Sequence, residues 1–336
     1  MFSKSGVYVA TRGSIHTIPV LRYVHMKTRK LAVAIIVYFF SSVIYADGVP
    51  VSRFGPDDTI GAINLLSPKK VLEAAKLIKT GKTYALGMVT GRDTPAYPPR
   101  TYDIVILQPG DGKGATQGSN LLTANDDILR TWIGIGSQLD GLAHIGVDHV
   151  YYNQAKAEDI VATTGMLKYG THDVPPIVTR GVLLDMTAIF GKPMLNEGEV
   201  FNTPHIKKAM KRQAVNITEG DVVLFHTGWH SLLGKDNTRF GAGEPGLGNE
   251  GAEFLSSLNV VAVGADTWGL EVVPMEDPNL VFPVHQTFLP RNGIYILENM
   301  VTAPLVADRV WEFLFVLGQP RLEGSVQAII NPIAIH

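Results

Sequence analysis

The chain has no cysteine among its 336 residues. This absence excludes disulfide bonds, thiolate nucleophiles and thiolate metal ligands, so any bound metal must be held by nitrogen and oxygen donors. A large excess of one charge is also lacking, since 29 Lys and Arg face 31 Asp and Glu. A nucleic-acid footprint needs clustered Lys and Arg, and the folded part has no such run, so we expect no nucleic-acid partner.

What the chain does contain is typical of a globular protein. Hydrophobic residues make up 46% of the chain and charged residues 18%, which is enough apolar side chain to bury a sizeable core. The 34 glycines and 20 prolines indicate many turns and loops, where functional sites tend to lie on a rigid scaffold.

The first 46 residues resemble a targeting region. A basic start at Met26–Lys30 precedes an apolar run of about fifteen residues at Leu31–Tyr45, and Ala46-Asp47-Gly48 resembles a cleavage site. We therefore expect a signal peptide over residues 26–46, which is the chain's sole membrane contact, and a secreted or periplasmic product. A retained anchor or a buried helix are the alternatives. Residues 1–25 are unlike a signal sequence, so we expect them to be untranslated or unstructured.

Residues 48–336 show no composition shift, so we assign them to one catalytic domain. Ser67-Pro68 suits the start of a helix that runs to about Lys79. Further helices are expected over His205–Arg212 and Glu250–Leu258. Five short apolar runs, rich in β-branched residues, predict strands: 182–186, 222–225, 260–264, 294–297 and 326–330.

Continuous apolar runs, as opposed to alternating ones, favour strands that are covered on both faces. Because helices separate these strands, we expect an α/β fold: a single domain with a curved or barrel-like mixed β-sheet flanked by helices. The segments Thr94–Arg100 and Gly110–Gly118 are expected to be long surface loops.

The segment from Ser137 to His144 concentrates the polar chemistry. In an extended chain Gln138 and Asp140 project to the same face, and His144 can return to that face after a bend at Gly141. Far downstream, His285 lies just before an expected loop and Glu298 ends an apolar strand. Two carboxylates, two imidazoles and one amide can together hold one divalent ion, whose bound water would become a nucleophile near neutral pH.

The same stretch resembles the cyclase-like metal-dependent hydrolases, a family that includes bacterial kynurenine formamidase and isatin hydrolase. The family motif, His-x-Gly-Thr-His-x-Asp-x-Pro-x-His, aligns with Gly134–His144. The later metal-binding His and Glu of the family align with His285 and Glu298. Matching flanking segments extend the resemblance over most of residues 52–305: 54–58, 61–67, 180–185, 227–229 and 264–267.

Three motif positions differ from the family pattern. Gly134 and Gln138 replace the first two histidines, and Leu142 replaces the proline. In two-metal members those histidines hold one of the ions, so the resemblance implies that this ion loses a ligand here. Gln138 still has a carbonyl oxygen to offer, or it supports the loop by hydrogen bonding. We therefore expect one divalent metal, Mn or Zn, in an oxygen-rich site with Gln138, Asp140, His285 and Glu298 as ligands, and favour Mn over a pair of Zn ions.

The resemblance also implies the remaining roles. His144 aligns with the general acid/base of the family, which suits an imidazole whose ordinary pKa is about 6.5. Phe54 aligns with an aromatic residue that packs on substrate in some relatives. Trp229 and His230 follow one expected strand and Asp266 follows another, so they either line the substrate pocket or cap the strands.

These observations predict a metal-dependent amidohydrolase that cleaves a C–N bond of a small amide or lactam, such as an arylformamide or cyclic amide. An ester or lactone hydrolase, or a dehydratase, on the same site is one alternative. A secreted binding protein of the same fold without turnover is another. The resemblance further implies a homo-oligomer.

Overall fold

The computed structural model describes residues 48–107 and 114–336. The expected signal peptide at 26–46 and the segment 1–25 lie outside these residues, as does part of the Gly110–Gly118 loop. Among the helices that are described, none has the length and apolar character needed to cross a membrane.

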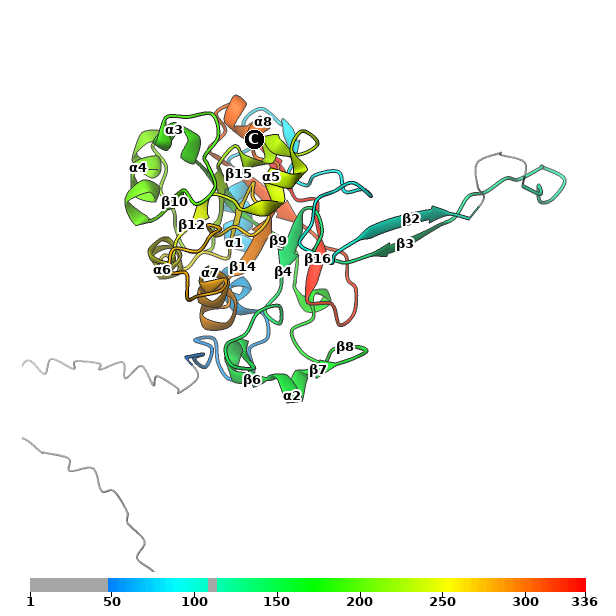
Figure 1. Ribbon diagram of the computed structural model, residues 1–336, viewed down its shortest axis with the longest axis horizontal. Coiled ribbons are helices and arrows are strands. Elements are labelled where there is room, and N and C mark those ends of the chain that lie inside the picture. The colour runs from blue at the N-terminus through cyan, green and yellow to red at the C-terminus, as the bar shows by residue number, and fades with distance from the viewer. Residues whose placement is uncertain (1–47, 108–113) are drawn as a thin grey trace, which may run out of the picture. The chain divides into compact units, whose positions relative to one another are not determined.

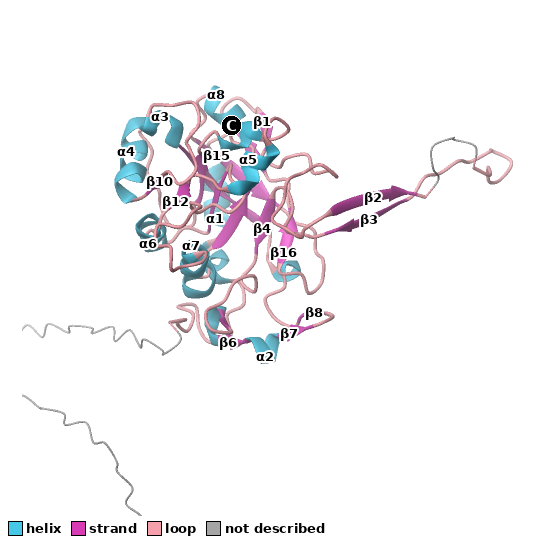
Figure 2. Ribbon diagram, in the orientation of Figure 1, coloured by secondary structure: helices cyan, strands magenta, loops and turns pink. Residues whose placement is uncertain are grey.

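A mixed, strongly curled sheet of nine strands forms the centre of the domain (Figures 1 and 2), in the order β1-β17-β15-β9-β11-β13-β14-β4-β16. The four central strands β9, β11, β13 and β14 run parallel, and antiparallel strands continue the sheet on both sides. The predicted α/β fold with a curved mixed sheet is therefore confirmed. The strands of this sheet are β1 Thr83–Ala85, β4 Gln138–Asp140, β9 Ile177–Asp185, β11 Val222–His226, β13 Ala262–Ala265, β14 Tyr295–Glu298, β15 Glu312–Leu317, β16 Gln327–Ile329 and β17 Ile333–Ile335.

The central strands are buried on both faces, as their continuous apolar sequences predict. Along β9, Val182 and Leu184 pack in one core cluster while Leu183 packs in the other, because successive side chains point to opposite faces. All three are fully buried. The five predicted strands all form, with β9 beginning earlier in the sequence than expected.

Helices cover the sheet at the three predicted places. They are α1 Pro68–Ala75, α4 Thr203–Gln213 and α6 Asn249–Ser257. The Ser67 hydroxyl caps α1 by accepting from the backbone N–H of Lys70 at 3.3 Å. This helix ends four residues before Lys79 because the chain tightens there into i→i−3 bonds, such as Leu77 N–H to Ala74 O.

The remaining elements are short. The helices are α2 Ala157–Ile160, α3 Met186–Phe190, α5 Asn237–Ala242, α7 Pro283–Gln286 and α8 Ala303–Ala307. The 3₁₀ turns are Gly61–Leu65, Tyr152–Gln154, Thr171–Asp173 and Trp229–Leu232, and Thr287–Asn292 forms a π-helical turn. The strand pairs are β2 Tyr102–Ile106 with β3 Asp127–Thr131, β5 Val150–Tyr151 with β6 Ala155–Lys156, β7 Val161–Ala162 with β8 Gly165–Met166, and β10 Val200–Phe201 with β12 Gly246–Leu247.

The pair β2–β3 forms an arm that projects away from the sheet (Figure 1). The sequence predicts loops on either side of β2 but does not predict the arm itself. Its apolar side chains, including Val105 and Leu129, are about half exposed, so the arm is not part of the core from which strands were inferred. At the base of the arm, Thr101 and Thr131 line the same cavity as His144.

Candidate metal centre

Three neighbouring strands bring the polar side chains of the site together. β4 lies between β14 and β16, and its register sets Gln138 opposite Glu298 and Asp140 opposite Gln327. Directly paired residues of antiparallel strands project to the same face, and so do residues two apart on one strand. The strand pairing therefore places four polar side chains on one buried patch of the sheet.

His285 reaches this patch from α7, a short helix where the sequence suggested only the approach to a loop. Its Nε2 lies 3.5 Å from Asp140 Oδ2 and 3.3 Å from Glu298 Oε1. Ligand atoms of these three residues all lie within 4.8 Å of one another, and each residue is at most 4% exposed. Metal–ligand bonds of about 2 Å fit an ion at the centre of such a triangle.

The hydrogen bonds of the cluster fit a cation. Asp140 Oδ2 is buried and has no hydrogen-bond partner, which is costly for a carboxylate oxygen unless a positive charge compensates it. Glu271 Oε1 lies 2.6 Å from His285 Nδ1, so Nδ1–H donates to this carboxylate and the lone pair of Nε2 faces the cluster. Glu271 is held in turn by the backbone N–H groups of Val284 and His285.

The electrostatics of the two carboxylates differ. Burial and the neighbouring Asp140 carboxylate raise the pKa of Glu298 to about 7. For Asp140 burial acts in the same direction, but His144, His285 and the Gln327 hydrogen bond outweigh it and lower the pKa to about 2. A divalent cation between these carboxylates would favour the ionised form of both.

Gln138 lies against the same two carboxylates. Its amide nitrogen donates to Glu298 Oε2 at 2.6 Å and to Asp140 Oδ1 at 3.1 Å. The donor end of the amide thus faces the ligands, whereas a metal ligand would present the carbonyl oxygen. This orientation of the amide favours a hydrogen-bonding role for Gln138 over a role as metal ligand.

His144 lies beside the cluster. The bend at Gly141, where the His144 N–H donates to Gly141 O, returns the ring toward Asp140 with 3.9 Å between Nε2 and Oδ2. Burial, together with the charges of His285 and Arg100, lowers the pKa of His144, and the Asp140 carboxylate opposes this shift. The imidazole therefore favours the neutral form, which can accept a proton.

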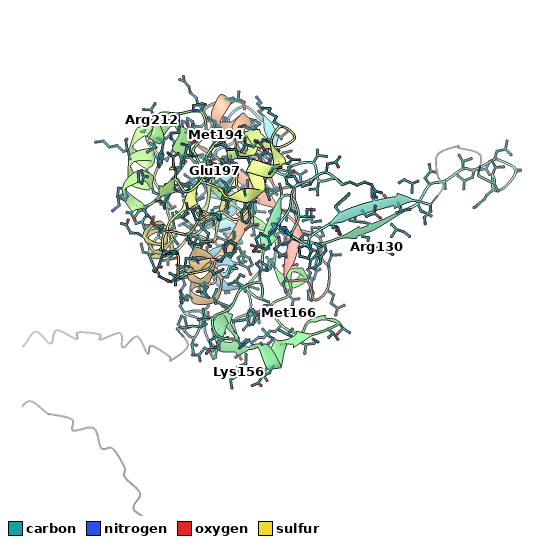
Figure 3. The ribbon with its side chains drawn as sticks, viewed as in Figure 1. Arg130, Lys156, Met166, Met194, Glu197 and Arg212 are labelled. Atoms are coloured by element: carbon teal, nitrogen blue, oxygen red, sulfur yellow. The ribbon has the colours of Figure 1, made fainter. Side chains whose placement is uncertain are left out.

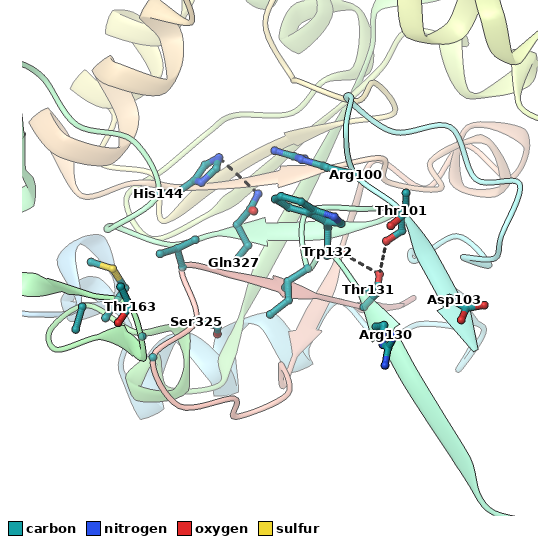
Figure 4. Close-up of a pocket in the computed structure, with 16 residues that line it drawn as sticks. Arg100, Thr101, Asp103, Arg130, Thr131, Trp132, His144, Thr163, Ser325 and Gln327 are labelled. Carbon is teal, nitrogen blue, oxygen red and sulfur yellow. Dashed lines mark hydrogen bonds between the residues drawn. The ribbon is translucent and has the colours of Figure 1, made fainter. Parts of the chain in front are cut away.

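A cavity of about 160 Å³ encloses this chemistry. Its walls are Tyr97, Arg100, Gln138, His144, Ile145, Trp268, Gly269, Phe282, His285 and Glu298. Arg100 and His144 also line a larger, open cavity of about 800 Å³ at the base of the arm (Figure 4). Small reacting groups fit the inner cavity, and the outer one offers room for the remainder of a substrate.

A family comparison matches this arrangement. The model of the cyclase family, described as "Putative cyclase", matches residues 84–272, more than half of the chain. The chain belongs to the cyclase family. The resemblance predicted from Gly134–His144 is thereby confirmed, and the predicted His285 and Glu298 lie beyond the matched segment.

Solved structures agree with this cyclase-family fold. A structure described as a novel cyclase is 26% identical, with a TM-score of 0.77, and the match covers 85% of this chain and 98% of that one. Isatin hydrolase A from Ralstonia solanacearum is 17% identical, with a TM-score of 0.56 and coverage of 75% and 91%. An isatin hydrolase bound to the product analogue thioisatinate is 18% identical, with a TM-score of 0.56 and coverage of 80% and 98%. No curated protein matches the sequence.

The four expected substrate-binding residues do not line the inner cavity of this cyclase-family chain. Trp229 is fully buried and its Nε1–H donates to Phe240 O at 3.3 Å. Asp266 accepts from the backbone N–H groups of Thr227 and Gly228, so it holds the turn after β11. His230 lies in that same turn, and Phe54 lies under Arg53 in the N-terminal loop. Trp229 and Asp266 thus support the fold, and the substrate-binding role expected for them stays a prediction.

Three residues near the centre were not anticipated. Glu271 orients His285, Gln327 donates to Asp140 Oδ1 at 2.7 Å, and Arg100 lines both cavities. Glu271 and Gln327 are single polar residues within apolar runs, Leu270–Val273 and Val326–Ile330. Such residues need a partner when buried, and that signal would have marked them.

His226 lies at the end of β11, next to the turn that Asp266 holds, and its pKa can be measured to test the effect of the Asp266 carboxylate. Burial by itself lowers the pKa of His226, but the Asp266 carboxylate, 3.1 Å from Nδ1, outweighs burial and raises the pKa above its ordinary value. We expect an NMR titration to place this pKa above about 6.5 and Asp266→Asn to lower it.

Because folding raises the pKa of His226, the stability that its ion pair with Asp266 contributes depends on pH. The ion pair stabilises the fold fully below the unfolded pKa of about 6.5 and is lost as pH rises through the folded pKa. The wild-type melting temperature should therefore lose the part of its advantage over Asp266→Asn that comes from the ion pair as pH rises through that range. A His226 that titrates below its ordinary range would contradict this reading.

Proposed function

We propose that this chain is a divalent-metal hydrolase that cleaves a C–N bond of a small amide or lactam, such as an arylformamide or cyclic amide. The observation that carries the proposal is the buried Asp140–His285–Glu298 cluster with its unpaired Asp140 oxygen, next to the proton-accepting ring of His144.

In this proposal Asp140, His285 and Glu298 hold the metal, and Glu271 orients His285. When bound, the cation supplies Lewis acidity and an acidified water. His144 accepts a proton at one ring nitrogen and returns it to the leaving nitrogen, a role suited to its position on the wall of the inner cavity. Gln138 and Gln327 hold Asp140 Oδ1, which leaves Oδ2 for the metal.

The donor set supports Mn or Zn. Two carboxylates and one imidazole suit either ion, and no thiolate is available to favour a softer one. Within residues 48–107 and 114–336, one cluster of at least three His or carboxylate ligands is present, which supports a single ion for each chain. The thioisatinate-bound neighbour supports a lactam or arylamide, because that compound is described as the product analogue of a hydrolase with this fold.

Metal removal with a substrate panel tests the proposal. We expect elemental analysis to find about one Mn or Zn per chain. Turnover of formanilide or isatin should disappear in chelator and return when Mn²⁺ or Zn²⁺ is added. Phenyl acetate and a lactone serve as comparison substrates, and faster turnover of these would favour the ester hydrolase. If the protein held no metal and turned over none of these substrates, this result would favour the alternative of a binding protein without catalytic activity.

A further inference from the structure

Arg100 lies where the two cavities meet and plays no part in the proposed metal chemistry. It immediately precedes the arm, lines both cavities, and in Figure 4 extends over Trp132 toward His144. The side chain is half-buried. Because it lines the inner cavity together with Glu298 and His285, it lies near the metal cluster, and it is also accessible from the outer cavity. Its charge acts on Glu298 and on His144 alike.

The local structure makes room for this guanidinium. Arg100 Nη1 donates to the backbone carbonyl of Gly134. A Cβ atom added at position 134 would lie 2.6 Å from Nη1 and 2.6 Å from Gln327 Oε1, closer than real Cβ contacts allow. Glycine at this position is therefore a condition for the placement of Arg100, and any larger residue would displace it.

Arg100 has no carboxylate partner among the described residues. The acidic residue on the same cavity wall, Asp103, is already paired with Arg92. Arg130, on the facing strand of the arm and directly opposite Asp103, also lines the outer cavity (Figure 4). The outer cavity is thus lined by two guanidinium groups and one carboxylate, and Arg100 is the guanidinium that also reaches the inner cavity.

We propose that Arg100 is a specificity-determining residue that binds a carboxylate on the substrate, and this rests on the proposed hydrolase function. The planar guanidinium matches a carboxylate in a two-point, charge-assisted contact. The inner cavity admits only a small acyl group, while Trp132, Ile133 and Val326 offer an apolar wall for the ring of the leaving group. The substrate class is therefore an N-acyl arylamine or lactam that carries an acidic group on its ring.

Binding measurements test this assignment without turnover. Calorimetry on the metal-loaded protein would compare 2-aminobenzoate with its uncharged isostere 2-aminobenzamide. We expect wild type to prefer the carboxylate by about 10- to 100-fold, as for hydrogen bonds to charged groups. Arg100→Gln should abolish the preference without weakening the binding of 2-aminobenzamide. Arg100→Lys should keep part of the preference, since lysine retains the positive charge but lacks the planar guanidinium.

The matched control is Arg212→Gln, on α4 and well separated from the arm in Figure 3. Metal content and melting temperature of each variant show that the fold is retained. A wild-type protein without preference for the carboxylate, or an Arg100→Gln variant that keeps the preference, would overturn the proposal.

Kinetics separate this proposal from the hydrolase proposal. Arg100→Gln should raise KM for 2-formamidobenzoate by about 10-fold or more relative to KM for the uncharged formanilide. Any change in kcat that comes from the lost charge should be the same for both substrates. Failure of wild type to cleave any amide would overturn the hydrolase proposal alone, because the binding comparison still reports on Arg100. Equal KM changes for both substrates would overturn the role of Arg100 alone.

Discussion

Replacing Asp140 by asparagine is expected to remove the metal and to abolish turnover. The asparagine Oδ1 can still accept from Gln138 and Gln327, so the hydrogen bonds of β4 are preserved. What is lost is the negative charge and the lone pairs of Oδ2, the buried oxygen that has no other partner. Because even residues that only support ligands change metal affinity by 10- to 100-fold, we expect a loss of at least about 100-fold.

The measurement for Asp140→Asn is metal content by elemental analysis, followed by turnover at saturating Mn²⁺. Asp159→Asn is the matched control, since Asp159 is exposed on α2 and is not one of the clustered ligands. An Asp140→Asn protein that keeps both its metal and its activity would contradict the metal centre itself.

Replacing His144 by alanine is expected to give the second large effect: turnover falls while the metal remains. His144 is not one of the three clustered ligands, and its nearest ring nitrogen is 3.9 Å from Asp140 Oδ2. Loss of a general acid/base costs about 10²- to 10⁴-fold in rate. The loss should appear in kcat, with metal content equal to that of wild type.

A suitable control for His144→Ala is His149→Asn. His149 is exposed, and its φ of 63° is a conformation that asparagine tolerates better than alanine. If His144→Ala lost the metal, His144 would be a ligand. If it kept wild-type turnover, the proton would be carried by another group.

The fold was largely predictable because its strands have a simple signature. Val222–Phe225 is a continuous apolar run, and the structure buries both of its faces in two separate core clusters. The arm was not predictable in this way, because Val105 and Leu129 resemble core residues in sequence but are half exposed. Apolar composition predicts that a segment forms a strand, but it does not show whether that strand lies in the core or projects from it.

The site was predictable only in part, for a related reason. The common face of Gln138 and Asp140 follows from the two-residue period of a strand. The convergence of His285 and Glu298 with them was inferred from the family resemblance. Glu271 is marked only as a polar residue within an apolar run, which does not identify its partner His285. Arg100 carries no signal of this kind, since its placement depends on the space left at Gly134.

The sequence by itself determined that metal ligands must be nitrogen or oxygen atoms, since the chain has no thiolate. It also determined that the central sheet is buried on both faces and that two polar residues share one face of β4. Only the tertiary structure decided which end of Gln138 faces the carboxylates, which acid holds His285, and which cation lies at the cavity mouth. The physical reason is that local periodicity sets the direction of a side chain. Its partner across more than a hundred residues is set by strand register and close packing.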